Sequence, residues 1–226
     1  MAFCPNCGRV SVDKYPNNRP VADFHCARCG EEYELKSQQG AFGSRVVDGA
    51  YRAMIGRLQS SNNPNFFLLR YDLTALQVVD LVVIPKHFFV PGLIEKRKPL
   101  SPTARRAGWT GCNILLAEIP PSGRIFVIRN REVQPRGTVL SLWQKTLFLR
   151  DQPPTPAKGW LLHVMQVVET LGKREFTLNE VYQRESELKA AYPRNRHVRE
   201  KIRQQLQVLR DQGYLHFVSR GYYRLA

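Results

Sequence analysis

Short runs of consecutive apolar residues lie within the first 150 positions and predict strands. The runs cover residues 66–71, 78–84 and 125–128. Because apolar residues fill successive positions, and not only alternate ones, we expect both faces of these strands to be covered. The pattern favours an α/β domain built around a buried sheet.

Helical spacing appears beside these runs. Apolar positions recur at intervals of three and four at Val47, Tyr51, Met54, Ile55 and Leu58. This spacing predicts a helix over residues 45–60, ended by the turn-forming stretch at 62–65. A second, short helix is expected over residues 140–149. Residues 91–111 contain three prolines and five basic residues, which indicates an irregular segment.

The last third of the chain has a different pattern. A proline-rich linker over residues 151–159 predicts a boundary between a domain at 1–150 and a domain at 160–226. Helices are expected over residues 160–171, 178–191 and 197–211, the second beginning with a capping box of Thr177 and Glu180. A hairpin over residues 214–225 follows. Three helices and a hairpin are typical of a winged helix-turn-helix domain.

Composition and charge narrow the function. Of 226 residues 43% are hydrophobic, and no apolar stretch reaches the length of a membrane helix or the form of a signal peptide. We therefore expect a cytoplasmic protein without a membrane partner. The net charge is +15, with both halves of the chain basic. This charge favours a nucleic-acid partner, and a ribosome-associated or simply soluble basic protein is the alternative.

Four of the five cysteines form two C-x-x-C pairs, Cys4 with Cys7 and Cys26 with Cys29, separated by eighteen residues. Two such turns provide the four thiolates that a tetrahedral structural zinc requires. A redox C-x-x-C is the alternative, although two copies in so short a span disfavour it. The fifth, Cys112, is expected to be a small buried side chain.

Acidic residues and one lysine interleave with these pairs. Asp23 lies before the second pair, and Glu34-Leu35-Lys36 follows it. On a strand, Glu34 and Lys36 point to the same face. Two carboxylates, the Leu35 carbonyl and a lysine match the needs of Mg²⁺-dependent phosphodiester hydrolysis. A solvated strand edge or a simple ion pair is the alternative for Glu34 and Lys36.

Two basic segments are candidate DNA contacts. The irregular segment carries Trp109, which could stack on a base or pack on the core, and basic residues that could follow phosphates. In the winged helix, residues of the third helix, its approach and the hairpin tip would face DNA. A protein-binding winged helix with a solvated charged face is the alternative. The candidates are Arg105, Arg106, Trp109, Arg194, Asn195, Arg196, His197, Arg199, Lys201, Arg203, Gln204 and Arg220.

Longer blocks of sequence resemble the DpnI-like family of methyladenine-dependent restriction endonucleases. The resemblance runs nearly end to end and in the same order. Its blocks are Asn18-Arg19-Pro20-Val21-Ala22-Asp23-Phe24, Glu34-Leu35-Lys36-Ser37, Asn62-Asn63-Pro64-Asn65-Phe66-Phe67, Pro99-Leu100-Ser101-Pro102-Thr103-Ala104-Arg105-Arg106-Ala107-Gly108-Trp109 and Glu200-Lys201-Ile202-Arg203-Gln204-Gln205-Leu206.

The resemblance implies a PD-(D/E)xK nuclease core with an inserted Cys4 zinc site, followed by a winged-helix domain. It implies a bacterial enzyme that cleaves double-stranded DNA at GATC sites carrying N6-methyladenine. We expect a monomer that requires no protein partner, and whether it cuts as a monomer is left open. Asp23, Glu34 and Lys36 would be catalytic, with Mg²⁺ held by Asp23, Glu34 and the Leu35 carbonyl. A non-cleaving zinc-containing winged-helix regulator and a repair nuclease for branched DNA are the alternatives.

Overall fold

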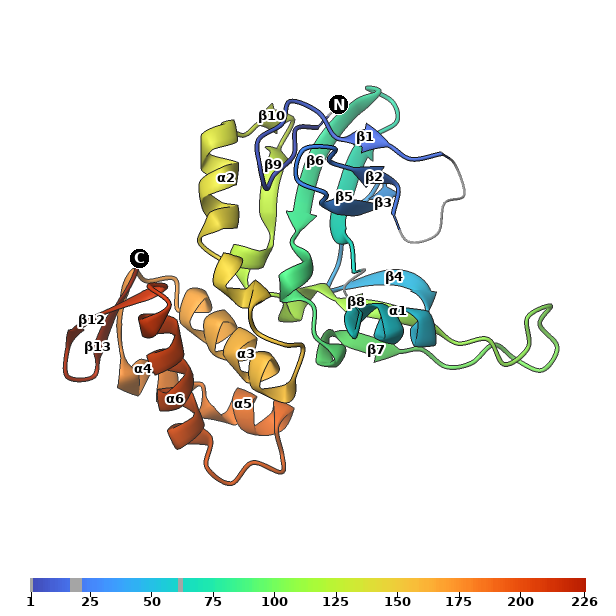
Figure 1. Ribbon diagram of the computed structural model, residues 1–226. Helices are drawn as coiled ribbons and strands as arrows, with labels where there is room; N and C mark the ends of the chain where they lie inside the picture. Colours follow the sequence, from blue (N-terminus) through green and yellow to red (C-terminus); the bar gives the residue numbers. More distant parts are fainter. Residues whose placement is uncertain (1, 17–21, 61–62) are drawn as a thin grey trace. The chain divides into compact units, whose positions relative to one another are not determined.

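The chain folds into two compact units, Met1–Arg150 and Asp151–Ala226. The computed structural model describes residues 2–16, 22–60 and 63–226, and Figure 1 follows them from blue to red along the sequence. Residues 18–21 of the first resembling block, and Asn62 in the predicted stop of the first helix, lie outside the described residues. No helix in the described part of the chain has the length and apolar character needed to span a bilayer.

A seven-stranded sheet forms the centre of the first unit. Across the sheet, its strands are β1 (Asp13–Lys14), β2 (Phe24–His25), β3 (Glu32–Gln38), β5 (Asn65–Asp72), β6 (Gln77–Ile84), β9 (Ile125–Arg129) and β10 (Glu132–Val133). Strands β3 and β5 are parallel, and the other neighbouring pairs are antiparallel. The three predicted strands are confirmed as β5, β6 and β9, but only the first half of β5 is fully buried.

The connection between β3 and β5 corrects the predicted helix over residues 45–60. Its first part is a strand, β4 (Arg45–Ala50), and only the second part is helical, as α1 (Tyr51–Leu58). Val46 is buried whereas Val47, assigned to the apolar helix stripe, is 62% exposed. The alternation is that of a strand, a conformation that β-branched valines favour.

β4 belongs to a second, three-stranded sheet. The sheet has the order β4-β8-β7, with β8 over Gly111–Leu115 and β7 over Ile94–Lys96. Helix α1 packs against this sheet. The segment predicted to be irregular therefore begins with a 3-10 helix and a strand, and from Arg97 to Thr110 it forms a long arm that extends the β7–β8 hairpin (Figure 1).

The core of the first unit lies between the large sheet and α2 (Arg136–Gln144). Trp143 from α2 and Tyr33 and Phe67 from the sheet are nearly inaccessible to solvent. Helix α2 begins four residues earlier than the predicted helix, whose last residues form a 3-10 turn. The 3-10 helices of the unit are η1 (Lys86–Phe88), η2 (Pro91–Leu93), η3 (Leu116–Glu118), η4 (Pro121–Gly123) and η5 (Leu147–Arg150).

The second unit contains the expected helices and hairpin with one additional strand. Its elements are α3 (Pro156–Thr170), β11 (Glu175–Thr177), α4 (Leu178–Gln183), α5 (Glu185–Ala191), α6 (Val198–Asp211), β12 (Leu215–Ser219) and β13 (Tyr222–Leu225). The predicted linker over 151–159 is helical from Pro156 onward. The helix predicted over 178–191 is divided at Arg184, and β11 joins the hairpin in the order β11-β13-β12.

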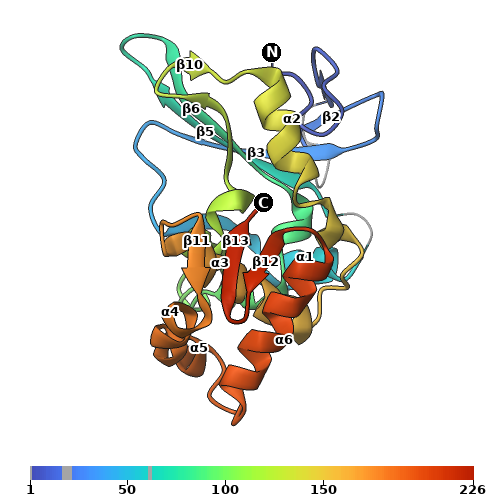
Figure 2. The ribbon, with the colours of Figure 1, turned by 90° about the vertical axis from the view of Figure 1, so that its left-hand side faces the viewer.

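Local signals placed the other features correctly. Thr177 and Glu180 form the capping box at the start of α4. The predicted apolar stripe of the last helix is buried in α6, at Val198, Ile202, Leu206 and Leu209. Figure 2 shows α6 beside the hairpin β12–β13 within this unit. Gly213 ends the helix with a φ of +70°, which glycine adopts without steric cost.

Candidate functional site

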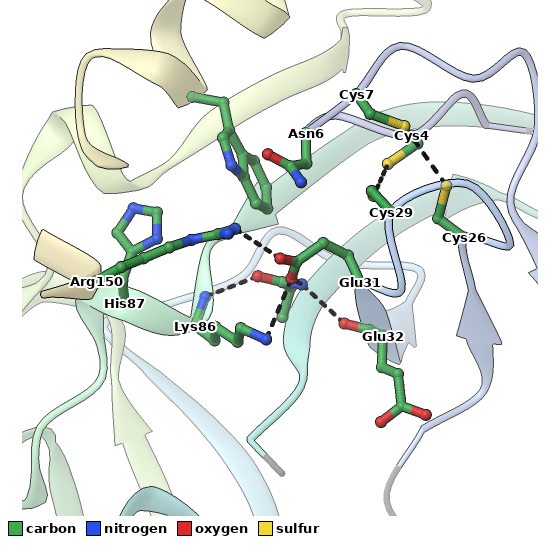
Figure 3. Close-up of polar contacts among 12 residues, drawn as sticks. Cys4, Asn6, Cys7, Cys26, Cys29, Glu31, Glu32, Lys86, His87 and Arg150 are labelled. Carbon is green, nitrogen blue, oxygen red and sulfur yellow. Dashed lines mark hydrogen bonds and ion pairs between the residues drawn. The ribbon is translucent and has the colours of Figure 1, made fainter. Parts of the chain in front are cut away.

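The two C-x-x-C turns meet face to face and form a compact sulfur cluster (Figure 3). The four Sγ atoms of Cys4, Cys7, Cys26 and Cys29 lie within 4.8 Å of one another. The pairs Cys4–Cys29 and Cys7–Cys26 are each separated by 3.6 Å. Zn–S bonds of about 2.3 Å in a tetrahedron place the sulfurs about 3.8 Å apart, so the cluster fits a four-coordinate zinc with no position left for substrate.

Each turn is closed by a glycine in the left-handed region. The amide of Gly8 donates to the carbonyl of Cys4, and the amide of Gly30 donates to that of Cys26. Both glycines have φ near +70°, a conformation that strains residues with a β-carbon. Burial alone would raise the pKa of Cys26, but backbone amides, including that of Cys29, lower it to about 7, which favours the thiolate that binds metal.

Tyr33 links the sulfur cluster to β3, the strand that carries Glu34 and Lys36. Its hydroxyl lies 3.1 Å from Cys4 Sγ and is buried. Burial, reinforced by the negative charge of Cys4, raises the pKa of Tyr33. The hydroxyl therefore keeps its proton and can donate to a metal-bound thiolate, as outer partners of metal ligands commonly do.

A buried carboxylate anchors the second C-x-x-C turn, that of Cys26 and Cys29. Glu31, two residues after Cys29, is 4% exposed. Arg150 approaches it to 2.6 Å, Lys86 to 3.3 Å, and the side-chain amide of Asn65 donates to it over 2.8 Å (Figure 3). The network joins the turn to β5, η1 and η5. Sequence reasoning missed it, because nothing local distinguishes Glu31 from an ordinary loop glutamate.

Two of the three residues predicted to be catalytic, Glu34 and Lys36, lie on β3, and the third, Asp23, lies beside it. The Lys36 ammonium lies 2.6 Å from Glu34 Oε1, on one face of the strand as expected. Asp23 precedes β2, and its Oδ2 accepts a hydrogen bond of 2.7 Å from the amide of Leu35. A further bond, from the amide of Asp23 to the carbonyl of Tyr33, holds the two segments together. The Asp23 side chain therefore lies against the Glu34–Leu35 peptide.

Two further residues complete the charge arrangement, and sequence reasoning missed both. Asp48 Oδ1 lies 2.6 Å from the Lys36 ammonium, and Arg57 Nη1 lies 3.3 Å from Glu34 Oε2. Asp48 comes from β4 and Arg57 from α1, the segment in which a strand was mistaken for a helix. The period-2 alternation of Val46 and Asp48 was the available signal.

Burial and charge oppose each other at this site. Burial raises the pKa of Glu34, although Lys36 counteracts it. Burial alone would lower the pKa of Lys36, but the carboxylates of Glu34 and Asp48 outweigh it, so the pKa is raised and the ammonium stays charged. Asp23 and Glu34 offer hard oxygen ligands suited to Mg²⁺, with a fixed cation beside them.

The arm carries Trp109 on its inner side. The ring is half-buried, with the Arg106 guanidinium 5.0 Å from its centre. Gly111 lies under the ring, since a β-carbon there would come within 2.9 Å of Trp109 Cη2. Trp109 therefore packs on its own hairpin. It is neither a fully exposed ring free to stack on a base nor a residue of the buried core. Arg105 is exposed.

The candidates in the second unit are mostly exposed, and several are held by neighbours. Arg199 pairs with Glu185 over 2.8 Å, and Arg203 donates to the Tyr182 hydroxyl over 2.9 Å. Lys201 donates to Gln204 over 2.7 Å. Asn195 caps the turn before α6 by accepting from the amide of His197. The exposed candidates are Arg194, Arg196, His197, Arg199, Arg203, Gln204 and, in the turn between β12 and β13, Arg220.

Both units match known protein families. The family model described as DpnI, the Dam-replacing family, matches residues 1–152. The model described as DpnI_C, the Dam-replacing HTH domain, matches residues 156–225. The two matches cover nearly the whole chain and agree with the resemblance seen in its sequence blocks. The chain therefore belongs to the DpnI, or Dam-replacing, family, which implies a nuclease that acts on DNA, and its second unit is the family's helix-turn-helix domain.

Proposed function

We propose that this protein is a type II, methyl-directed restriction endonuclease. It cleaves double-stranded DNA at GATC sites that carry N6-methyladenine, by Mg²⁺-dependent phosphodiester hydrolysis. The observation that carries the proposal is the placement of Glu34 and Lys36 on one face of β3, with Asp23 bonded to the Leu35 amide between them. Membership in the DpnI family supports restriction that depends on methylation.

In this proposal the first unit is a PD-(D/E)xK nuclease. Asp23, Glu34 and the Leu35 carbonyl hold Mg²⁺, which supplies an activated water and neutralises charge on the phosphate. Lys36 orients the attacking water and stabilises the negative charge that develops on the phosphorus centre. Burial of Glu34 and Lys36 keeps bulk water from weakening these interactions.

The four cysteines hold a structural zinc. Cys26 and Cys29 lie in the chain between Asp23 and Glu34, and Tyr33 joins the cluster to β3. The zinc therefore sets the separation of the two acidic residues without contacting the phosphate. Loss of the metal acts on cleavage through geometry or folding.

Both units contact DNA in the proposal. Arg105, Arg106 and Trp109 on the arm serve the catalytic unit. In the second unit, α6 enters the major groove and the hairpin tip touches the backbone. The proposed contacts there are Arg194, Asn195, His197, Arg199, Lys201, Arg203, Gln204 and Arg220. Arg199 must exchange its pairing with Glu185 for phosphate, at a modest cost because both groups are on the surface.

A plasmid digest tests the proposal. With Mg²⁺, plasmid methylated at GATC adenines should be cut and unmethylated plasmid should stay intact. Asp23→Ala should abolish cutting while methylated DNA is still bound. Equal cutting of both plasmids, or of neither, contradicts the methyl dependence. Cutting by the Asp23→Ala protein contradicts the assignment of the metal site, and specific binding without any hydrolysis indicates the regulator instead.

A further inference from the structure

Asp48 is a buried carboxylate outside the predicted catalytic set. Its side chain is 4% exposed, and its Oδ1 lies 2.6 Å from the Lys36 ammonium. A carboxylate is costly to bury unless a cation or several donors compensate it. Lys36 provides that compensation, so the two residues stabilise one another in the folded chain.

The backbone fixes the direction of the Asp48 side chain. Asp48 pairs with Cys112 of β8, and the register between β4 and β8 shifts immediately afterwards, between Asp48 and Ala50. Such bulges redirect a side chain relative to the regular strand. The buried Cys112 thiol contacts the carbonyl of Gly49 at 3.5 Å on this bulge. Asp48 therefore lies on a different sheet from Lys36, and its side chain contacts the Lys36 ammonium across the two sheets.

Glu34 and Lys36 each contact two groups of opposite charge. Glu34 has two cationic neighbours, Lys36 on Oε1 and Arg57 on Oε2. Lys36 has two carboxylate neighbours, Glu34 and Asp48. A divalent cation bound by the Glu34 carboxylate would compete with Lys36 and Arg57 for its oxygens. Lys36 would then keep only one of its two carboxylate partners, Asp48.

We infer that Asp48 is a positioning residue, which holds the Lys36 ammonium beside the reacting phosphate when Glu34 turns to the metal. The inference rests on the proposed nuclease function and deepens it. Asp48 acts through Lys36 and touches neither DNA nor metal. The competing role for a buried carboxylate here is that of a ligand to a second metal ion, which would not depend on Lys36.

The first test needs neither Mg²⁺ nor DNA. Melting temperatures of the zinc-loaded protein without Mg²⁺ are measured for Asp48→Asn, Lys36→Met and the double variant. Lys36→Met leaves the buried Asp48 carboxylate without its cation, and Asp48→Asn removes one of the two carboxylates beside Lys36, so each change should lower the melting temperature. The double variant should fall by clearly less than the sum of the two, because the pair is removed together. Additive falls would overturn the contact on which the inference depends.

The second test is single-turnover cleavage of a methylated duplex. Asp48→Asn should slow the chemical step by up to about 100-fold, the cost that a displacement of a catalytic group by about 1 Å can reach. DNA affinity in Ca²⁺ should change by less than about twofold. In the Lys36→Met background, adding Asp48→Asn should cause no further slowing. Asp80→Asn is the matched control, an aspartate on β6 that pairs with Arg70 at 2.6 Å, and its rate should stay near wild type.

The outcomes separate the inference from the function on which it rests. If the unaltered protein fails to cut methylated DNA, the proposed function fails while the melting cycle still reports on the pair. If it cuts, and Asp48→Asn cuts at the same rate, the positioning role is refuted. Further slowing by Asp48→Asn in the Lys36→Met background refutes it as well, since Asp48 would then act independently, as a metal ligand does.

Discussion

Glu31 offers the sharpest test of how the zinc turn is held in the first unit. In Glu31→Gln the shape of the side chain is kept and its remaining carbonyl oxygen can still accept from Asn65, whereas the negative charge and one acceptor oxygen are lost. Hydrogen bonds to charged groups contribute about 1.5–3 kcal/mol each. The same range for each ionic contact of Glu31, with Arg150 and with Lys86, gives a sum of about 3–6 kcal/mol. Both cations are about a third exposed and regain water when the partner is lost, which removes about half of that sum.

We therefore expect Glu31→Gln to lower the free energy of unfolding by about 1.5–3 kcal/mol. At about 2–4 °C per kcal/mol for a chain of this size, the melting temperature should fall by about 3–12 °C. The assay is thermal and urea unfolding of the zinc-loaded protein, with bound zinc measured beside it. Because the network anchors the turn of Cys29, zinc release to a chelator should also become faster.

The control is Glu132→Gln, which alters an exposed glutamate of the same unit. It should change the unfolding free energy by no more than about 0.5 kcal/mol. A loss in Glu31→Gln that is no larger than in this control would refute the reasoning. Unchanged zinc release would refute the claim that the network supports the turn.

Four other predictions follow from single features. Cys26→Ser should abolish stoichiometric zinc binding and cleavage, as measured by metal analysis and plasmid digestion. Thr177→Ala should lower the unfolding free energy of the second unit by about 1 kcal/mol in urea, because the capping box is lost. Burial lowers the pKa of Lys158 from 10.5 to about 8. The charged form therefore opposes folding at neutral pH, stability should rise between about pH 8 and 10.5, and Lys158→Met should remove this rise. Arg203→Ala should weaken DNA binding and reduce its salt slope by about one unit if Arg203 contacts phosphate.

Local patterns were sufficient for the features whose chemistry is local. The cysteine spacing predicted a four-sulfur cluster, and the i, i+2 relation of Glu34 and Lys36 predicted their shared face. The capping box and the stripe of α6 depend on neighbours within a few positions in the sequence. These predictions are confirmed by the structure at the level of geometry.

Features that depend on distant partners were missed. Val46 and Val47 fit a helical spacing as well as a strand, and the choice is made by β8, more than sixty residues further along the chain. Asp48 and Arg57 were hidden by that error. Glu31 meets Arg150 only through tertiary folding. β11 is three residues long and exists because β13 pairs with it. Short-range patterns contain no information on such pairings.

The parallel pairing of β3 with β5 also affects when Glu34 and Lys36 on β3 acquire their neighbours during synthesis. A parallel pair cannot be closed by a tight turn, so β3 and β5 are joined by a crossover that contains β4 and α1. β8, on which β4 pairs, is synthesised later still, and non-local pairings form slowly. We therefore expect a nascent chain that already holds its zinc to lack the surroundings of Lys36. The strand that carries Asp48 gains its partner only after β8 has been made.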